Sequence, residues 1–154
     1  MKYLNQILLL SLSAAIVSCG GSGTEDFVKE EDALAGEVMA IHDEVMPKTA
    51  EVNRLSRQLD AYYQNNKASI SEEMDGRIEL MQRELEKAED GMMAWMTSYQ
   101  QPEVLRETLD HNAIMEQLRD QKKSIQGVAD QINTSIKEVK ELMAELPAQD
   151  NESD

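Results

Sequence analysis

Apolar residues recur at alternating steps of three and four positions over most of the chain beyond residue 24. This spacing places them on one face of an α-helix, so it predicts amphipathic helices that bury a continuous stripe. A first helix is predicted over residues 24–65, with one polar interruption of its stripe at Lys48. Its apolar members are Leu34, Val38, Ile41, Val45, Val52, Leu55, Leu59 and Tyr62. Pro47 predicts either a kink near residues 43–46 or a break with Pro47 in the first turn of a new helix.

A second helix is predicted over residues 70–100 and a third over residues 102–146. Ser69 and Glu72 match a capping box at the start of the second helix, and Pro102 fits the first turn of the third. The stripe of the second helix contains Met74, Ile78, Met81, Leu85, Ala88, Met92, Trp95 and Tyr99. The stripe of the third contains Val104, His111, Ile114, Leu118, Ile125, Val128, Ile132, Val139, Leu142 and Leu146.

Short connections make neighbouring helices antiparallel, so these stripes predict an all-α fold. We expect an elongated up-down-up three-helix bundle, an antiparallel coiled coil whose first helix is kinked near Pro47. The third helix would exceed the second by about 14 residues and overhang by about 20 Å. The apolar residues on this overhang, within residues 132–146, are Ile136, Val139, Leu142 and Met143. Exposed apolar residues need a cover, which would be a second copy of the chain, another protein, or the helix itself after a bend near Gly127.

The first eighteen residues have the organisation of a secretory leader, with Lys2 near the start and an apolar run up to Val17. That run is shorter than the ~20 residues of a spanning helix. Bacterial lipoproteins carry a lipobox, which resembles the run Ile16-Val17-Ser18-Cys19-Gly20. The resemblance implies cleavage before Cys19, a diacylglycerol on its sulfur and an acyl chain on the freed amine. The alternative is an ordinary leader followed by a stray thiol, since Cys19 is the only cysteine.

The chain is therefore expected to divide into a cleaved leader (1–18), a lipidated cysteine with a flexible tether (19–23), a helical bundle (24–146) and an acidic disordered tail (147–154). The glycine-rich tether would reach about 10–15 Å, which keeps the bundle close to its membrane. Thr24 is expected to cap the first helix. By analogy with lipoprotein sorting, Gly20 rather than Asp after the cysteine favours the outer membrane, on its periplasmic face or at the cell surface.

Charge limits the possible partners. The formal net charge is −15, and the leader contains one cation, Lys2, and no acid, so cleavage takes the charge to −16. Nucleic-acid binding needs clustered cations that face phosphates, so a nucleic-acid partner is not expected. Flat docking on anionic headgroups is disfavoured for the same reason. The predicted lipid on Cys19 must therefore supply the membrane attachment.

Both histidines and several methionines are expected to meet at one level of the bundle. If the connections are centred near residues 67–68 and 101–102, His42 faces Met93 and His111 faces Met92. The predicted set is Met39, His42, Met46, Met92, Met93, Met96, His111 and Met115. Thioether and imidazole groups together suit Cu(I) or another soft metal, which makes a copper ion the candidate cofactor. The alternative is that the methionines fill the core and that His111 lies at its edge.

The sequence contains no motif that predicts catalysis. It lacks a Glu-x-x-His pair, a His-Glu-x-x-His motif and a glycine-rich phosphate loop. With Cys19 acylated, no thiol nucleophile remains. The chain is therefore expected not to be an enzyme.

Residues 41–48, together with residues 92–96, resemble short bacterial envelope lipoproteins that often carry the label "viral A-type inclusion protein". The resemblance covers most of residues 35–100 and implies a helical envelope lipoprotein, but it supplies no activity and no functional residue. Three roles remain open: a structural or interaction module that binds a partner or itself, a periplasmic soft-metal binder, and a helical chaperone whose Met-rich, acidic surface holds unfolded chains.

Overall fold

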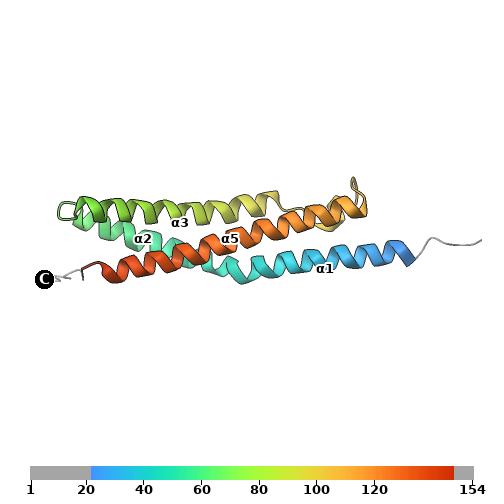
Figure 1. The fold of residues 1–154 in the computed structure, drawn as a ribbon, viewed down its shortest axis with the longest axis horizontal. Helices are drawn as coiled ribbons and strands as arrows, with labels where there is room; N and C mark the ends of the chain where they lie inside the picture. Colours follow the sequence, from blue (N-terminus) through green and yellow to red (C-terminus); the bar gives the residue numbers. More distant parts are fainter. Residues whose placement is uncertain (1–21, 148–154) are drawn as a thin grey trace, which may run out of the picture.

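The computed structural model describes residues 22–147, which form an elongated bundle in which all regular structure is helical (Figure 1). The helices are α1 (Ser22–Val45), η1 (Met46–Lys48), α2 (Thr49–Asn66), α3 (Glu72–Ser98), α4 (Pro102–Leu105) and α5 (His111–Glu145). The chain runs along α1 and α2, returns along α3 and runs out again along α5. The predicted all-α up-down-up bundle is therefore confirmed. The predicted leader, Cys19 and residues 148–154 of the predicted tail lie outside the described residues.

The bend between α1 and α2 follows from Pro47, as predicted. Proline has no N–H to donate, and here it occupies the first turn of the short 3-10 helix η1, where that donor is not needed. The Thr49 hydroxyl donates to the carbonyl of Met46 over 2.7 Å, and Lys48 donates to Asn133 on α5 over 2.8 Å. The polar interruption of the first stripe is therefore a contact between helices.

Two predicted helix starts are wrong. The cap of α3 is Ser71, whose side chain accepts from the Met74 N–H over 3.3 Å. Ser69 instead donates to the Asn66 carbonyl over 3.0 Å and closes the preceding turn. At the start of the bundle, α1 already includes Ser22, so Thr24 lies inside its first turn, and Ser22 and Gly23 of the predicted tether are helical.

The third predicted helix is divided. Its first turn is α4, with Pro102 at the predicted position, and α5 begins after a separate cap at Asp110, which accepts from the Ala113 N–H over 3.0 Å. The intervening residues shift α5 along the bundle relative to the predicted register. The Trp95 indole consequently donates to the Gln121 carbonyl over 3.3 Å.

The shift removes the predicted overhang. The end of α5 lies beside the start of α3, where Arg77 and Glu145 form an ion pair of 2.7 Å. Val139 and Leu142 are buried there, and Ile136 is only 8% exposed. The prediction of an exposed apolar overhang at residues 132–146 is therefore wrong, and binding of a second copy or another protein at this segment stays a prediction.

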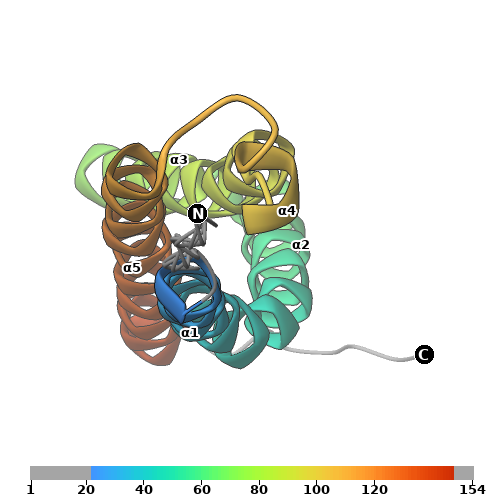
Figure 2. The ribbon, with the colours of Figure 1, turned by 90° about the vertical axis from the view of Figure 1, so that its right-hand side faces the viewer.

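The buried residues form two clusters. The larger one joins α1, α2, α3 and α5 along most of the bundle, and its largest fully buried members include Leu59, Ile78, Leu85, Met92 and Ile132. The smaller cluster joins the middle of α1 to α4 and to the start of α5, and it consists of Ala35, Leu105, Ile114 and Leu118. Each such apolar side chain contributes about 1.5–3 kcal/mol on burial. Figure 2 shows α5 beside both α1 and α3, its main packing partners.

Ser135, a polar residue of α5 between the stripe residues Ile132 and Val139, is fully buried. Its hydroxyl donates to the Glu84 carbonyl on α3 over 3.0 Å and accepts from Gln131. A buried hydroxyl with both roles satisfied does not weaken the packing as an unpaired one would.

The Arg77–Glu145 pair predicts a pH-dependent signature. The guanidinium, by its hydrogen bond and its charge, lowers the pKa of the Glu145 carboxyl below its ordinary value. A lowered carboxyl pKa stabilises the fold above the unfolded-state pKa, and this contribution is lost as pH falls through the folded-state pKa. Replacing Arg77 with Gln is expected to raise the Glu145 pKa towards its ordinary value, measured by NMR titration of the side-chain carboxyl carbon. In the control variant Arg83→Gln the pKa of Glu145 should not change. An unchanged Glu145 pKa in Arg77→Gln would contradict the ion pair between Arg77 and Glu145.

Candidate functional site

The predicted methionine and histidine residues lie in two separate regions of the bundle. His42 lies at the level of Trp95, and their rings stack with centroids 5.4 Å apart. The predicted alignment of the first helix with the second is thus close to the observed one. His111, by contrast, contacts Glu31 on α1 at 2.9 Å. Since Glu31 precedes His42 by eleven positions on one helix, the two levels are about 16 Å apart. The predicted convergence of both histidines is therefore wrong.

Around His42 the structure gathers five of the predicted residues beside the larger core cluster. Met92 is 1% exposed, and the partly buried residues packed against the cluster include Met39, Met46 and Met96. Met93 instead points outward and is 57% exposed. Met115 lies one turn after His111 on α5, away from this region. Sulfur atoms near His42 are accounted for by packing, and the binding of a copper ion stays a prediction.

An aromatic column organises the His42 region. Trp95 stacks on His42 and on Tyr99, whose ring centroid lies 5.0 Å away. The His42 Nδ1 atom is 2.9 Å from the carboxylate of Asp43, which occupies one of its two nitrogens. Burial, followed by the charge of Glu103, raises the pKa of the Tyr99 hydroxyl. Among residues 22–147, the other imidazole nitrogen of His42 has no hydrogen-bond partner, and it lies beside a buried indole.

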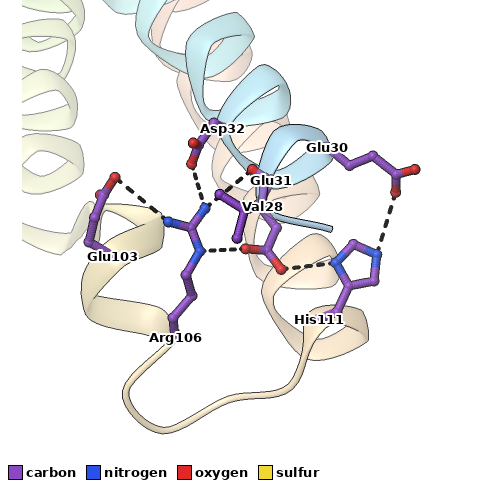
Figure 3. A network of polar contacts seen from close by, with 7 residues as sticks. All are labelled: Val28, Glu30, Glu31, Asp32, Glu103, Arg106 and His111. Atoms are coloured by element: carbon purple, nitrogen blue, oxygen red, sulfur yellow. Dashed lines mark hydrogen bonds and ion pairs between the residues drawn. The ribbon is translucent and has the colours of Figure 1, made fainter. Parts of the chain in front are cut away.

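The second region is a network of charged side chains at the end of the bundle where α1 begins (Figure 3). Glu31 is 2% exposed, and its two carboxylate oxygens have different partners. One lies 2.6 Å from Arg106 Nε and the other 2.9 Å from His111 Nδ1. Buried charges are tolerated when they are paired and hydrogen-bonded, and Glu31 meets both conditions.

Arg106 is the centre of this network. Besides Glu31 it bonds to the carboxylate of Asp32, donates to the Val28 carbonyl over 3.4 Å, and lies 3.8 Å from Glu103. The hydrogen bonds to Asp32 and Glu31 raise its pKa further above the ordinary arginine value, so it stays charged. A planar guanidinium with five donors is suited to several acceptors at once.

His111 completes the network from the first turn of α5. Its Nε2 atom is 3.5 Å from the Glu30 carboxylate, and its ring stacks on Phe27 with centroids 4.1 Å apart. Figure 3 shows that Arg106 and His111 approach Glu31 from opposite sides. The network thus ties three segments together: the start of α1, the residues after α4 and the start of α5.

The network around Glu31 is suited to holding helices together rather than to catalysis or metal binding. Both oxygens of the buried carboxylate are engaged by cationic or donor groups, so Glu31 is not available as a general base. Over residues 22–147, no group of three or more His, Cys, Asp or Glu side chains is arranged to hold a metal ion. Within the same range, no helix is long and apolar enough to cross a membrane.

Glu31 and Arg106 were not among the predicted site residues. A signal for Glu31 exists, because it lies seven positions before Val38 and three before Leu34 and so extends the apolar stripe of α1. No comparable signal exists for Arg106, which falls where the third stripe predicted a continuous helix. Comparison with family models, with curated proteins and with solved structures gives no match for the chain.

Proposed function

We propose that this chain is a lipid-anchored protein of the bacterial cell envelope whose helical bundle acts as a structural or protein-interaction module. Cys19 carries the diacylglycerol and the N-acyl chain. Only Gly20 and Gly21 separate this residue from the start of α1 at Ser22. The start of the bundle is therefore held close to the membrane, which by analogy with lipoprotein sorting is the outer membrane. The far end of the elongated bundle then extends away from the membrane surface.

The observation that carries this proposal is the network around Glu31. An anchored bundle bears any load through the helix that continues from its anchor, so the start of α1 must not separate from the other helices. Arg106 and His111 fasten that segment through a carboxylate that is 2% exposed. The smaller core cluster supports the same segment from inside. A module that is tethered through the start of α1 requires contacts that hold this segment to the other helices.

Expression of the full chain in a bacterial host, with metabolic labelling by an alkyne-bearing palmitate, tests the anchor. We expect a labelled protein in the membrane fraction whose mature N-terminus is a triacylated Cys19 by mass spectrometry. The Cys19→Ser variant should lose both the label and the membrane attachment. Crosslinking of the anchored wild-type chain in intact cells should also yield a discrete larger complex with a partner or a second copy.

Each half of the proposal has its own contrary result. A wild-type chain that retains the leader, or that carries an unmodified Cys19 thiol, would contradict the anchor. A correctly lipidated chain that crosslinks as a monomer at every reagent length tried would contradict the interaction role and leave a structural role within the envelope.

A further inference from the structure

A groove on the surface of α5, beside α1, offers a binding site separate from the network around Glu31. It is open to solvent along its length and has a volume of about 700 Å³, which lies within the range of about 300–1,000 Å³ typical of small-molecule sites. Leu34 of α1 borders it on one side, and Arg119, Lys123 and Gly127 of α5 line it together with their neighbours. These α5 residues follow one another at steps of four and therefore share one face of the helix.

Two cations of this groove have no carboxylate partner among the residues that the structure describes. Most described cations, such as Lys122, which pairs with Glu37 at 2.5 Å, form ion pairs. Arg119 and Lys123 do not, although the chain has a net charge of −15 and twice as many acids as bases. Two unpaired cations one helical turn apart form a local site for an anion, and the planar guanidinium suits a carboxylate in particular.

Gly127 keeps the groove open. A Cβ atom added at this residue would meet nothing within 4 Å, so neither close packing nor crowding requires glycine there. Glycine weakens a helix interior relative to alanine, because it loses more conformational freedom on folding. The missing side chain instead leaves the α5 surface open one turn beyond Lys123, in the groove that the partly buried Leu34 also lines.

We propose that this groove binds a single-chain anionic amphiphile of the fatty-acid class. Its carboxylate pairs with Arg119 and Lys123, and its alkyl chain lies over Gly127 against Leu34 and the methylene stems of the basic side chains. Asp130 lines the far end of the groove and repels the carboxylate, which fixes the orientation of the ligand. The proposal goes beyond the anchoring role and depends on the α1–α5 surface alone.

The test uses a fatty acid that carries a diazirine and a terminal alkyne, irradiated with bacterial membranes that contain the full chain. Labelled peptides are mapped by mass spectrometry, and the other peptides of the same protein serve as the internal standard. We expect labelling to concentrate on residues 119–130 and on the segment around Leu34. The Arg119→Gln/Lys123→Gln variant should reduce this labelling at least tenfold, and the matching photoactivatable alcohol should label the groove weakly.

Matched variants separate the groove from general charge and folding effects. Arg57→Gln/Lys67→Gln removes a cation of α2 and the cation at its C-cap, which likewise have no carboxylate partner among the described residues, and it should leave labelling unchanged. Gly127→Met places a side chain across the open floor of the groove and should abolish labelling without loss of helicity. Gly76→Met makes the same change at another helical glycine whose added Cβ meets nothing within 4 Å, and it should have no effect on labelling.

Three results would overturn the proposal. One is equal labelling by the acid and the alcohol. Another is labelling concentrated near the start of α1, which would indicate contact with the bilayer. The third combines two observations: p-benzoylphenylalanine at Gln126 captures a second copy of the chain, and Arg119→Gln/Lys123→Gln leaves fatty-acid labelling unchanged. Together they would assign the groove to an interface between copies.

Discussion

Replacing Arg106 with alanine is expected to lower the free energy of unfolding by about 3 kcal/mol, because removing one partner of a buried ion pair leaves the other charge uncompensated. The stranded group is Glu31, whose side chain is 3% exposed and lies 2.6 Å from the guanidinium. The effect should fall at the lower end of the range for buried pairs, since His111 still contacts the other carboxylate oxygen. Urea denaturation followed by far-UV circular dichroism measures it, provided that the slope with denaturant stays constant.

Two controls distinguish a buried charge network from a loss of side-chain packing. Arg83→Ala removes an arginine of an exposed pair with Glu79, 3.4 Å apart and more than half exposed on both sides, so it should cost less than about 0.5 kcal/mol. The double variant Glu31→Met/Arg106→Met replaces both charges with apolar groups and should be clearly more stable than Arg106→Ala. A cost for the double variant equal to or above that of Arg106→Ala would show that the ion pair itself is not what holds α1.

The location of the destabilisation carries more information than its size. The part of α1 up to residue 35 is joined to the other helices by the network and by the smaller core cluster, whereas its last turns pack in the larger cluster with Val38 and Val45. Loss of Arg106 should therefore increase amide hydrogen exchange over residues 24–35 before it affects α3. Such local opening of the start of α1 would separate the anchored segment from the other helices, so the proposed anchoring role requires the network to be intact.

The sequence was sufficient for the fold class because most of the buried apolar residues of the larger cluster are stripe residues. Leu55, Leu59, Ile78, Leu85 and Ile132 all belong to the predicted stripes, and all are at most 2% exposed. The bend at Pro47 was also predictable, because the missing N–H leaves few places in a helix for a proline. Hydrophobic periodicity and one backbone constraint thus specify an up-down-up bundle.

The register of α5 could not be predicted from the same stripes. The predicted arrangement placed Met92 beside His111, whereas a Cβ atom on Gly91 would lie 3.7 Å from Val128. The difference amounts to about two heptads, and a shift by whole heptads returns every apolar residue to the seam. Only the length of the connection decides between such registers, and residues 106–110 contain neither glycine nor proline to mark the end of a helix.

The same error explains why His111 and Met115, the two candidate residues on α5, were misplaced. The position of His42 depends only on the first connection, whose centre was predicted well, so it meets Trp95 as expected for that level. The position of His111 depends on the second connection, and it lies beside Glu31 instead. Buried charges such as Glu31 are also hidden from a search for apolar stripes, because a carboxylate is normally assigned to the exposed face.

Replacing Trp95 with alanine is expected to lower the free energy of unfolding by about 3–5 kcal/mol, the range for deleting a large aromatic side chain from a core. The indole is 4% exposed and packs in the larger cluster between His42 and Tyr99. Its N–H also donates to the Gln121 carbonyl, which would be left without this donor. Since Trp95 is the only tryptophan in the chain, unfolding must be followed by circular dichroism rather than by intrinsic fluorescence.

Trp95→Phe separates the two contributions, because it keeps an aromatic ring but removes the indole N–H and part of the volume. It should cost clearly less than Trp95→Ala and should preserve a ring-current shift on the His42 imidazole protons in NMR spectra, which alanine abolishes. If Trp95→Ala cost less than about 1.5 kcal/mol, below what burying one apolar side chain contributes, the level at which α1, α3 and α5 meet would not be a packed core. The alignment of His42 with α3, on which any role for the methionines around it depends, would then have to be abandoned.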